Sequence, residues 1–243
     1  SQYRDAHLPG ALFASLDRDL SAPKDGTNGR HPLPDPRAFI AWLGQCGLKP
    51  DDTVVCYDAG NGAMTARLWW LLRWVRHERV AVLDGGWKAW LDAGSPTSTT
   101  APVPVQGDFR GSPEPWTVDA ARLQAHLGAP DMVVVDARAA DRFRGENETL
   151  DPVGGHIPGA RNRPFADNLT PAGAFKDPAV LRAEFGRLLG ATAPAHVVHQ
   201  CGSGVSACHN LLAMEVAGMG GSRLYPGSWS EWCAEPLRPI ARG

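Results

Sequence analysis

The chain contains two short motifs that each occur twice, in the same order and at nearly the same separation. His-Leu-Pro-Gly-Ala at residues 7–11 returns as His-Ile-Pro-Gly-Ala at 156–160. Farther along each half, the tryptophan-containing stretch at 83–90 has its counterpart at 225–232. Self-similarity over so long a period indicates that one structural unit has been duplicated. The sequence therefore predicts two domains of the same fold.

Each copy carries the same succession of patterns between its two motifs. A β-branched run, at residues 53–57 or 196–199, is followed by a loop of small residues and then by an apolar helical pattern. Strands that alternate with helices favour a parallel sheet with helices on both faces. We therefore expect an α/β fold in which each domain is a mostly parallel, doubly wound sheet.

The boundary between the domains is expected in a proline-rich segment. Residues 99–115 contain several prolines and little apolar periodicity, which is typical of a linker. This gives domains at 1–98 and 116–243. The second half has a helix pattern at 117–127 and a strand pattern at 132–136 before its first motif, and the first half has no counterpart. We expect the first domain to lack an N-terminal segment, although a genuinely shortened domain with an open sheet edge is the alternative.

Charge and hydropathy exclude some classes of partner. The 243 residues carry a net charge of -2, so no electrostatic excess points to nucleic acid or to an acidic membrane surface. The strongest apolar stretch, residues 68–75, is far shorter than the ~20 residues that a membrane-spanning helix needs. The first residues lack the apolar core of a secretion signal. We expect a cytoplasmic protein that acts on small molecules or other proteins.

The cysteines indicate free thiols. There are five, and they form neither a Cys-x-x-Cys pair nor a Cys/His group with zinc spacing. An odd number without dense spacing also argues against a disulfide framework and fits a reducing compartment. We expect no metal and no other cofactor, which leaves a thiol as a candidate chemical group.

Cys201 has the sequence context of a nucleophile. It follows the second-half strand and opens the loop Cys-Gly-Ser-Gly-Val-Ser-Ala at 201–207, which leads into an apolar helix. Such a loop points backbone N–H groups inward and forms an anion-binding nest at the N-terminus of the helix. That field favours the thiolate, which is the nucleophilic form of cysteine. The alternative is a buried structural cysteine beside a turn.

The matching loop of the first half, residues 57–62, has Asp58 where Cys201 stands. One nucleophile on a duplicated scaffold predicts that the first domain is catalytically silent and helps to shape the site, because pockets often form at domain interfaces.

These motifs resemble those of the tandem rhodanese-like sulfurtransferases, a family of thiosulfate and 3-mercaptopyruvate sulfurtransferases. The resemblance covers nearly the whole chain, and its most specific part is the loop at 201–207. This loop is similar to the Cys-Gly-Ser-Gly-Val-Thr-Ala form of the mercaptopyruvate enzymes, whereas animal-type thiosulfate enzymes carry Arg-Lys after the cysteine. The resemblance implies two tandem rhodanese-like domains.

The same resemblance implies an activity. Sulfur from 3-mercaptopyruvate would pass through a persulfide on Cys201 to a thiol, cyanide or thioredoxin. A thiosulfate:cyanide sulfurtransferase is the alternative, and a non-enzymatic rhodanese-like module is a further one that Cys201 argues against. A phosphatase with a Cys-x5-Arg loop is disfavoured, because position 207 is Ala207.

Further site residues follow from the resemblance. Arg142 matches a substrate-binding arginine, and a guanidinium is well suited to grip a carboxylate. Many members have a second arginine farther along, where this chain has Leu150 and Asp151. The alternative for Arg142 is a solvated surface side chain. The implied substrate-binding part of the loop consists of Gly202, Gly204, Val205 and Ser206.

The remaining implied residues form a proton relay. Asp17 and His31 fall where the mercaptopyruvate branch has an acid and a histidine that work with the loop serine, here Ser203. A lone histidine in a proline-rich loop is also often structural, so both interpretations of His31 stay open.

Overall fold

The computed structural model describes residues 2–243 and divides into two compact units. The first unit comprises residues 2–22, 33–114 and 172–174. The second comprises residues 23–32, 115–171 and 175–243. Residues 23–32 thus come from the first half of the sequence but make their contacts in the second unit.

The second unit is built on a four-stranded sheet in which every strand runs parallel to its neighbours. The strands are, in spatial order, β4 (Arg161–Asn162), β3 (Val133–Asp136), β5 (Val197–Gln200) and β6 (Arg223–Leu224). In the centre, Val134 is aligned with Val198 and Asp136 with Gln200. Their shared carboxyl ends place the residues that follow each strand at one edge of the sheet.

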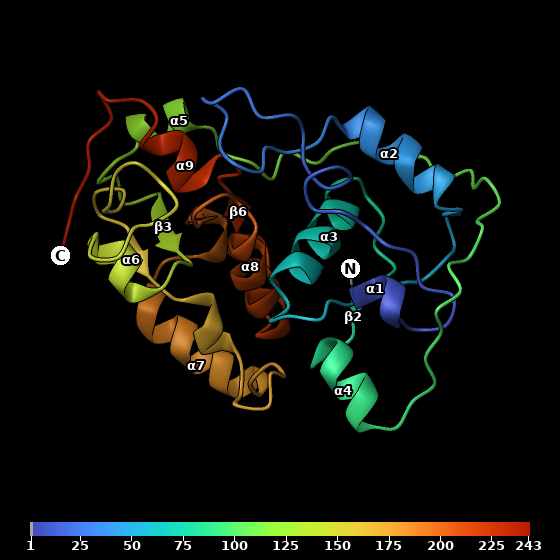
Figure 1. Cartoon of the computed structure of the whole chain (residues 1–243). Coiled ribbons are helices and arrows are strands. Elements are labelled where there is room, and N and C mark those ends of the chain that lie inside the picture. The colour runs from blue at the N-terminus through green and yellow to red at the C-terminus, as the bar shows by residue number, and fades with distance from the viewer. Residues whose placement is uncertain (1) are drawn as a thin grey trace. The chain divides into compact units, whose positions relative to one another are not determined.

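Helices cover both faces of this sheet (Figure 1). They are α5 (Ala120–Ala125), α6 (Ala140–Arg144), α7 (Pro178–Leu189), α8 (Ser206–Val216) and α9 (Ser228–Trp232), with 3-10 turns η1 (Phe165–Asn168) and η2 (Pro194–His196). Val134 and Val198 pack with residues of α5 and α9, whereas Val135 and Val197 pack with residues of α7 and α8. This alternation follows from the two-residue period of a strand.

Helix α7 illustrates how the local sequence sets an element. Asp177 accepts a hydrogen bond from the backbone N–H of Ala179, and a proline begins the helix. Leu181, Phe185 and Leu189 recur on one side and are buried. Burial of each such side chain contributes roughly 1.5–3 kcal/mol, which docks α7 on the sheet.

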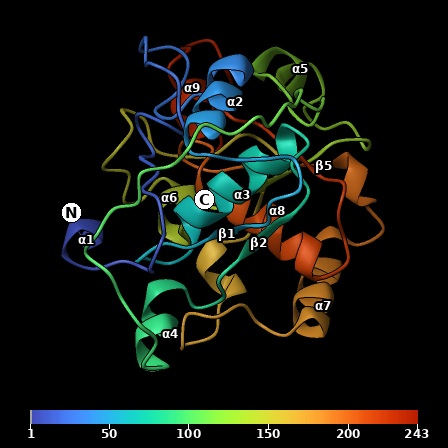
Figure 2. The same cartoon turned by 90° about the vertical axis from the view of Figure 1, so that its right-hand side faces the viewer.

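The first unit contains a smaller parallel sheet of β1 (Val54–Cys56) and β2 (Val80–Val82). Its helices are α1 (Gln2–Asp5), α2 (Pro36–Gln45), α3 (Ala63–Trp74) and α4 (Gly86–Asp92). The mostly buried α3 packs against both strands (Figure 2). Two parallel sheets with helices confirm the predicted α/β class.

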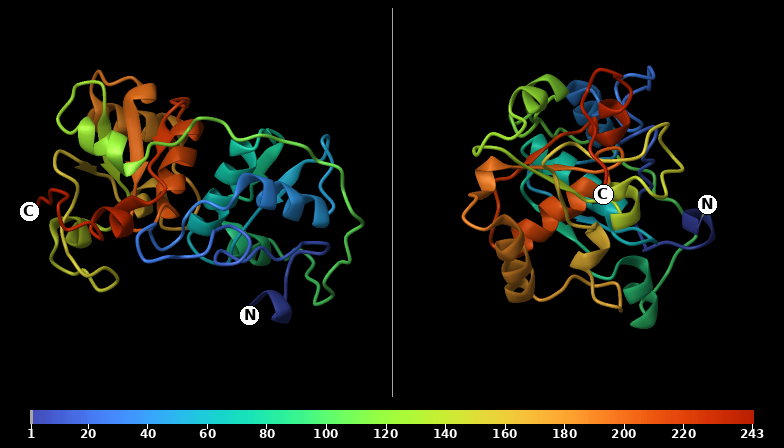
Figure 3. Two further views of the ribbon diagram at one scale, coloured as in Figure 1. Left: turned by 90° about the horizontal axis from the view of Figure 1, so that it is seen from above. Right: turned by 90° about the vertical axis from the view of Figure 1, so that its left-hand side faces the viewer.

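Residues 99–115 contain no helix or strand, and all but the last of them belong to the first unit (green trace in Figure 3). Backbone N–H groups of Gly107 and Phe109 donate to the carbonyls of Gly44 and Leu48, at 2.8 and 3.0 Å. This stretch is therefore bound to the end of α2 and to the residues that follow it. Within residues 2–243, no helix has both the length and the apolar character needed to cross a membrane.

Candidate active site

Cys201 lies at the carboxyl end of β5, where the chain turns toward α8. Its side chain is buried. The backbone N–H groups of Gly204 and Ser203 donate to Sγ of Cys201, at 3.1 and 3.5 Å. Sulfur at this point is therefore surrounded by amide dipoles that stabilise negative charge on it or on a sulfur atom bound to it.

The start of α9 fixes the backbone of residues 201–207, called here the cysteine loop. The N–H groups of Trp229 and Ser230 donate to the carbonyls of Cys201 and Gly202, at 2.9 and 3.0 Å. Ser228 holds the other side of the peptide, because its Oγ accepts from the N–H of Cys201 at 3.1 Å. The same hydroxyl donates to the carbonyl of Tyr225 at 2.9 Å. These hydrogen bonds hold the backbone of the loop in one conformation.

Ser228 adopts a backbone conformation that is unusual for a residue with a side chain. Its φ is 54°, in the left-handed region. Such a conformation costs of order 1–3 kcal/mol and persists only where the surroundings impose it. Here the two hydrogen bonds of its buried hydroxyl hold Ser228 beneath the Cys201 peptide.

The loop also needs a glycine at position 204. Gly204 has φ +77°, and a Cβ at this position would lie 2.3 Å from the carbonyl oxygen of Pro226. Val205 is buried at the end of the loop, and Ser206 begins α8. The predicted loop residues therefore form one continuous connection from β5 to α8, and the N–H groups of Ser203 and Gly204 face Sγ of Cys201.

The corresponding loop of the first unit shows what such a turn binds. Oδ1 of Asp58 accepts from the N–H groups of Gly60 and Gly62, at 2.9 and 3.1 Å, and Oδ2 accepts from that of Thr65 at 3.1 Å. A carboxylate of the chain itself thus fills this nest. The parallel supports an anionic preference for the nest around Cys201.

His31 lies beside the cysteine loop. Its Nδ1 is 2.7 Å from Oγ of Ser203. The segment that carries His31 is fastened to the start of α9, because the N–H of Arg30 donates to Oγ of Ser230 at 3.0 Å. Gly29 makes the approach possible, since it has φ +85° and a Cβ there would lie 2.7 Å from the carbonyl oxygen of Gly227.

Asp17 lies in the first unit. It is exposed in the turn at residues 16–19 of the first unit, whereas His31 and Ser203 belong to the second unit. Within the second unit, the structure brings His31 and Ser203 together, and the role of Asp17 stays a prediction.

Arg142 lies on α6 with its guanidinium directed at an acidic partner. Nη2 of Arg142 donates to both carboxylate oxygens of Glu148, at 2.7 and 2.8 Å. Burial by itself would raise the pKa of Glu148, but the hydrogen bonds from Arg142 and from the backbone N–H groups of Leu150 and Asp151, together with the charge of Arg142, hold that pKa below its ordinary value. The guanidinium also approaches the cysteine loop, since a Cβ on Gly202 would lie 3.6 Å from Nη2 of Arg142.

Comparisons with known proteins agree with this geometry. The sequence matches the family described as "Rhodanese-like domain" over residues 1–93 and 119–235. It is 50% identical to the "Probable 3-mercaptopyruvate sulfurtransferase" of Pseudomonas aeruginosa, covering 99% of this chain and 86% of the relative. It is 34% identical to the "Thiosulfate sulfurtransferase" of Cricetulus griseus, covering 100% of this chain and 83% of that protein.

This chain is a tandem rhodanese-like sulfurtransferase. Its structure is similar to that of "3-mercaptopyruvate sulfurtransferase from Leishmania major", with a TM-score of 0.85 and 31% identity. That match covers 98% of this chain and 66% of the other. The family resemblance seen in the sequence motifs is therefore confirmed.

Sequence reasoning missed a buried cation of this sulfurtransferase, Arg138. Its Nη2 lies 2.7 Å from Oδ2 of Asp136, and its guanidinium stacks over Trp229 at 4.7 Å. Burial lowers the pKa of Arg138, but Asp136, Glu148 and the sulfur of Cys201 act in the opposite direction and raise it overall. The available signal was an Asp-x-Arg pattern that begins at the last residue of β3, Asp136.

Burial keeps three other cysteines of the sulfurtransferase as thiols. Burial raises the pKa of Cys46 and Cys233 to about 11 and that of Cys56 to about 12. Cys208 is buried within α8, and its Sγ donates to the carbonyl of Gly204 at 3.4 Å. The cysteine at the carboxyl end of β5 is therefore the best-placed nucleophile among the described residues.

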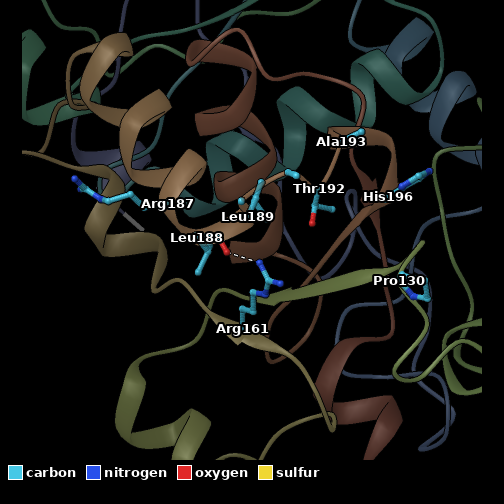
Figure 4. A pocket seen from close by; sticks show the side chains of 10 residues that line it. Pro130, Arg161, Arg187, Leu188, Leu189, Thr192, Ala193 and His196 are labelled. Atoms are coloured by element: carbon cyan, nitrogen blue, oxygen red, sulfur yellow. Dashed lines mark hydrogen bonds between the residues drawn. The ribbon is translucent and has the colours of Figure 1, made fainter.

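A separate depression lies at the opposite edge of the second unit's sheet (Figure 4). It is lined by residues that precede β3 and β5, among them Pro130 and His196, and by the end of α7. Arg161 reaches across it and donates to the carbonyl of Leu188. None of the predicted site residues lines this depression.

Proposed function

We propose that this sulfurtransferase moves a sulfur atom from 3-mercaptopyruvate to a thiol or cyanide acceptor through a persulfide on Cys201. The observation that carries the proposal is the pairing of His31 with Ser203, at 2.7 Å, on the loop whose amides surround Sγ of Cys201. The name of the 50% identical relative supports the same donor.

The leaving group of 3-mercaptopyruvate explains what the pair of His31 and Ser203 would do. In the first step, the thiolate of Cys201 forms a bond to the donor's sulfur while the carbon–sulfur bond breaks. The electron pair of that bond passes into the enolate of pyruvate, which is a poor leaving group unless its charge is stabilised and protonated. Ser203 would deliver this proton, with His31 as its hydrogen-bonding partner.

The step balances without any external oxidant or reductant. The sulfur atom moves to Cys201, and the proton that the donor's thiol carried ends on the methyl group of pyruvate. The resulting persulfide anion carries its charge on the outer sulfur, which the amides of the cysteine loop would stabilise. Arg142 would hold the donor's carboxylate during this step.

In the second step, an acceptor takes the outer sulfur. A thiolate or cyanide attacks that atom, and the thiolate of Cys201 leaves unchanged. Thioredoxin is a protein acceptor whose thiol chemistry fits this step. We propose a cytoplasmic setting, where thiols stay reduced.

A thiosulfate:cyanide activity is the second candidate. The relative from Cricetulus griseus is named for thiosulfate, and guanidinium groups near the cysteine loop suit a dianion. However, residues 202–206 of the loop itself contain no cation.

Two measurements separate the candidates. The kcat/KM values for 3-mercaptopyruvate and thiosulfate are compared at one acceptor concentration, and the intact mass is recorded after each donor. We expect a higher kcat/KM for 3-mercaptopyruvate and one added sulfur atom on Cys201, with Cys201→Ser inert. A higher value for thiosulfate would favour the second candidate, and added sulfur on Cys208 or Cys233 would refute Cys201 as the carrier.

A further inference from the structure

A second guanidinium lies beside the cysteine loop. A Cβ on Gly202 would be 2.7 Å from Nη2 of Arg30 and 3.6 Å from Nη2 of Arg142. The two arginines come from residues 23–32 and from α6, yet they approach the same residue, the one directly after Cys201. Both side chains are partly exposed, at 26% and 21%. They are therefore only partly buried, and a ligand can reach them.

One carboxylate lies between the two arginines. Oδ1 of Asp151 accepts a hydrogen bond from Nη1 of Arg30, and Oδ2 of Asp151 lies 3.6 Å from Nη2 of Arg142. The Asp151 side chain is only 3% exposed. Asp151 therefore holds Arg30 in place next to Arg142.

The charges around the two arginines differ. Arg142 makes three hydrogen bonds to Glu148, through Nε and Nη2. For the guanidinium of Arg30, Asp151 is the one carboxylate partner in the described part of the chain, and it uses Nη1. A guanidinium has five N–H donors, so Arg30 keeps Nη2, the atom nearest Gly202, available for a further anion.

We propose that Arg30 binds the carboxylate of the sulfur donor together with Arg142, and that Asp151 is its positioning residue. This inference rests on the proposed 3-mercaptopyruvate activity. The chain thus recruits its second donor-binding cation from residues 23–32, because position 151 carries an acid. The geometry favours a monocarboxylate, since a planar group can lie between the two guanidinium planes and accept from both.

The test compares donors that differ only in the carboxylate. Mercaptoacetone has the thiol and the carbonyl group of 3-mercaptopyruvate but no carboxylate. Arg30→Met keeps the apolar stem of the side chain, which protects packing. We expect this change to raise the KM for 3-mercaptopyruvate by about tenfold to a hundredfold, the loss of one charge-assisted hydrogen bond. The kcat, and kcat/KM for mercaptoacetone, should change less than about threefold.

Pyruvate provides a readout that does not depend on turnover of mercaptoacetone. It carries the carboxylate without the thiol, and its inhibition constant against 3-mercaptopyruvate should rise in parallel with KM. Arg30→Lys keeps the charge but not the planar guanidinium with its paired N–H donors. Its KM and its inhibition constant for pyruvate should lie between those of wild type and Arg30→Met. Arg144→Met is the matched control, because Arg144 also pairs with an acid, Glu146, but is more exposed and should leave all constants unchanged.

A double variant separates donor binding from simple charge balance. Arg30→Met alone leaves the charge of Asp151 facing the donor, and repulsion would also raise KM. In Arg30→Met/Asp151→Asn that charge is absent, and we expect KM to stay at least about tenfold above wild type. A wild-type KM in the double variant, or equal losses on both donors, would overturn the proposal.

The failure of the proposed function itself would look different. In that case wild-type enzyme would acquire no sulfur on Cys201 from 3-mercaptopyruvate. If wild type acquires the sulfur and Arg30→Met has an unchanged KM and an unchanged inhibition constant for pyruvate, then only the role of Arg30 is refuted.

Discussion

Nδ1 of His31 lies 2.7 Å from Oγ of Ser203, although 172 positions separate the two residues in the chain. The contact exists because residues 23–32 belong to the second unit and are fastened to the start of α9 through the N–H of Arg30. A hydroxyl held by an imidazole at this distance can pass a proton to a substrate placed over the cysteine loop.

The first prediction concerns this pair. Ser203→Ala and His31→Asn should each lower kcat/KM for 3-mercaptopyruvate by about 10²–10⁴-fold, the usual contribution of general acid–base catalysis. With thiosulfate the leaving group is sulfite, a stable anion, so the same variants should lose less than about threefold. Steady-state kinetics on both donors provides the measurement. Equal losses on the two donors would mean that the pair supports the loop rather than moves a proton.

The second prediction concerns Ser228, whose hydroxyl holds the Cys201 peptide. Ser228→Ala should lower the free energy of unfolding by about 1–3 kcal/mol, because the N–H of Cys201 is left buried without a partner. Ser228→Gly loses the same bond but adopts φ 54° without a steric penalty, so it should be less destabilised by about 1 kcal/mol. Urea unfolding of both variants measures the difference. If the alanine variant were the more stable one, the left-handed backbone would not be a source of strain.

A third prediction concerns the nest of the first unit. Asp58→Ala removes the acceptor of three backbone N–H groups and should destabilise the protein by about 1–3 kcal/mol. Asp58→Asn keeps one oxygen acceptor and should lose less. Thermal unfolding measures both, and intact mass should still show sulfur on Cys201 after donor treatment. Loss of sulfur loading in a folded Asp58→Ala variant would contradict the view of Asp58 as a structural residue.

The fold class was predictable because its signals are local. The repeated motifs, the β-branched runs and the small-residue loop after β5 each occupy a few consecutive residues. Cys201 and the loop around it were identified for the same reason. The pairing of Arg30 with Asp151 was not predicted, since it joins residues 121 positions apart and depends on where residues 23–32 make their contacts.

Position 151 shows the limit of reasoning by family pattern. The pattern has an arginine in this region, where this chain has Leu150 and Asp151, and by itself it points to no replacement cation. In the structure Asp151 instead forms an ion pair with Arg30. The acid stands at position 151 and the cation at position 30, so the site still contains a second guanidinium. Only the tertiary contacts show that this cation is Arg30.

The last prediction concerns acid stability and begins with His199, in the centre of β5. Its side chain is fully buried, and burial lowers its pKa from the ordinary 6.5 to about 3. Below pH 6.5 the unfolded chain therefore takes up a proton on this imidazole, whereas the folded chain does so only near pH 3. The unfolded state binds more protons in this window, so stability falls as the pH is lowered from 6.5 toward 3.

The slope contributed by one such group approaches about 1.4 kcal/mol per pH unit once the pH is well below 6.5. Other groups titrate in acid as well, so the informative quantity is the difference between variants. His199→Asn removes the titrating group, and its free energy of unfolding should depend less steeply on pH between 6 and 4.5 than that of wild type. His196→Asn, three positions earlier and exposed, is the matched control. Urea unfolding at several pH values measures these slopes, and parallel curves for wild type and His199→Asn would show that the buried imidazole is not the group that makes the fold sensitive to acid.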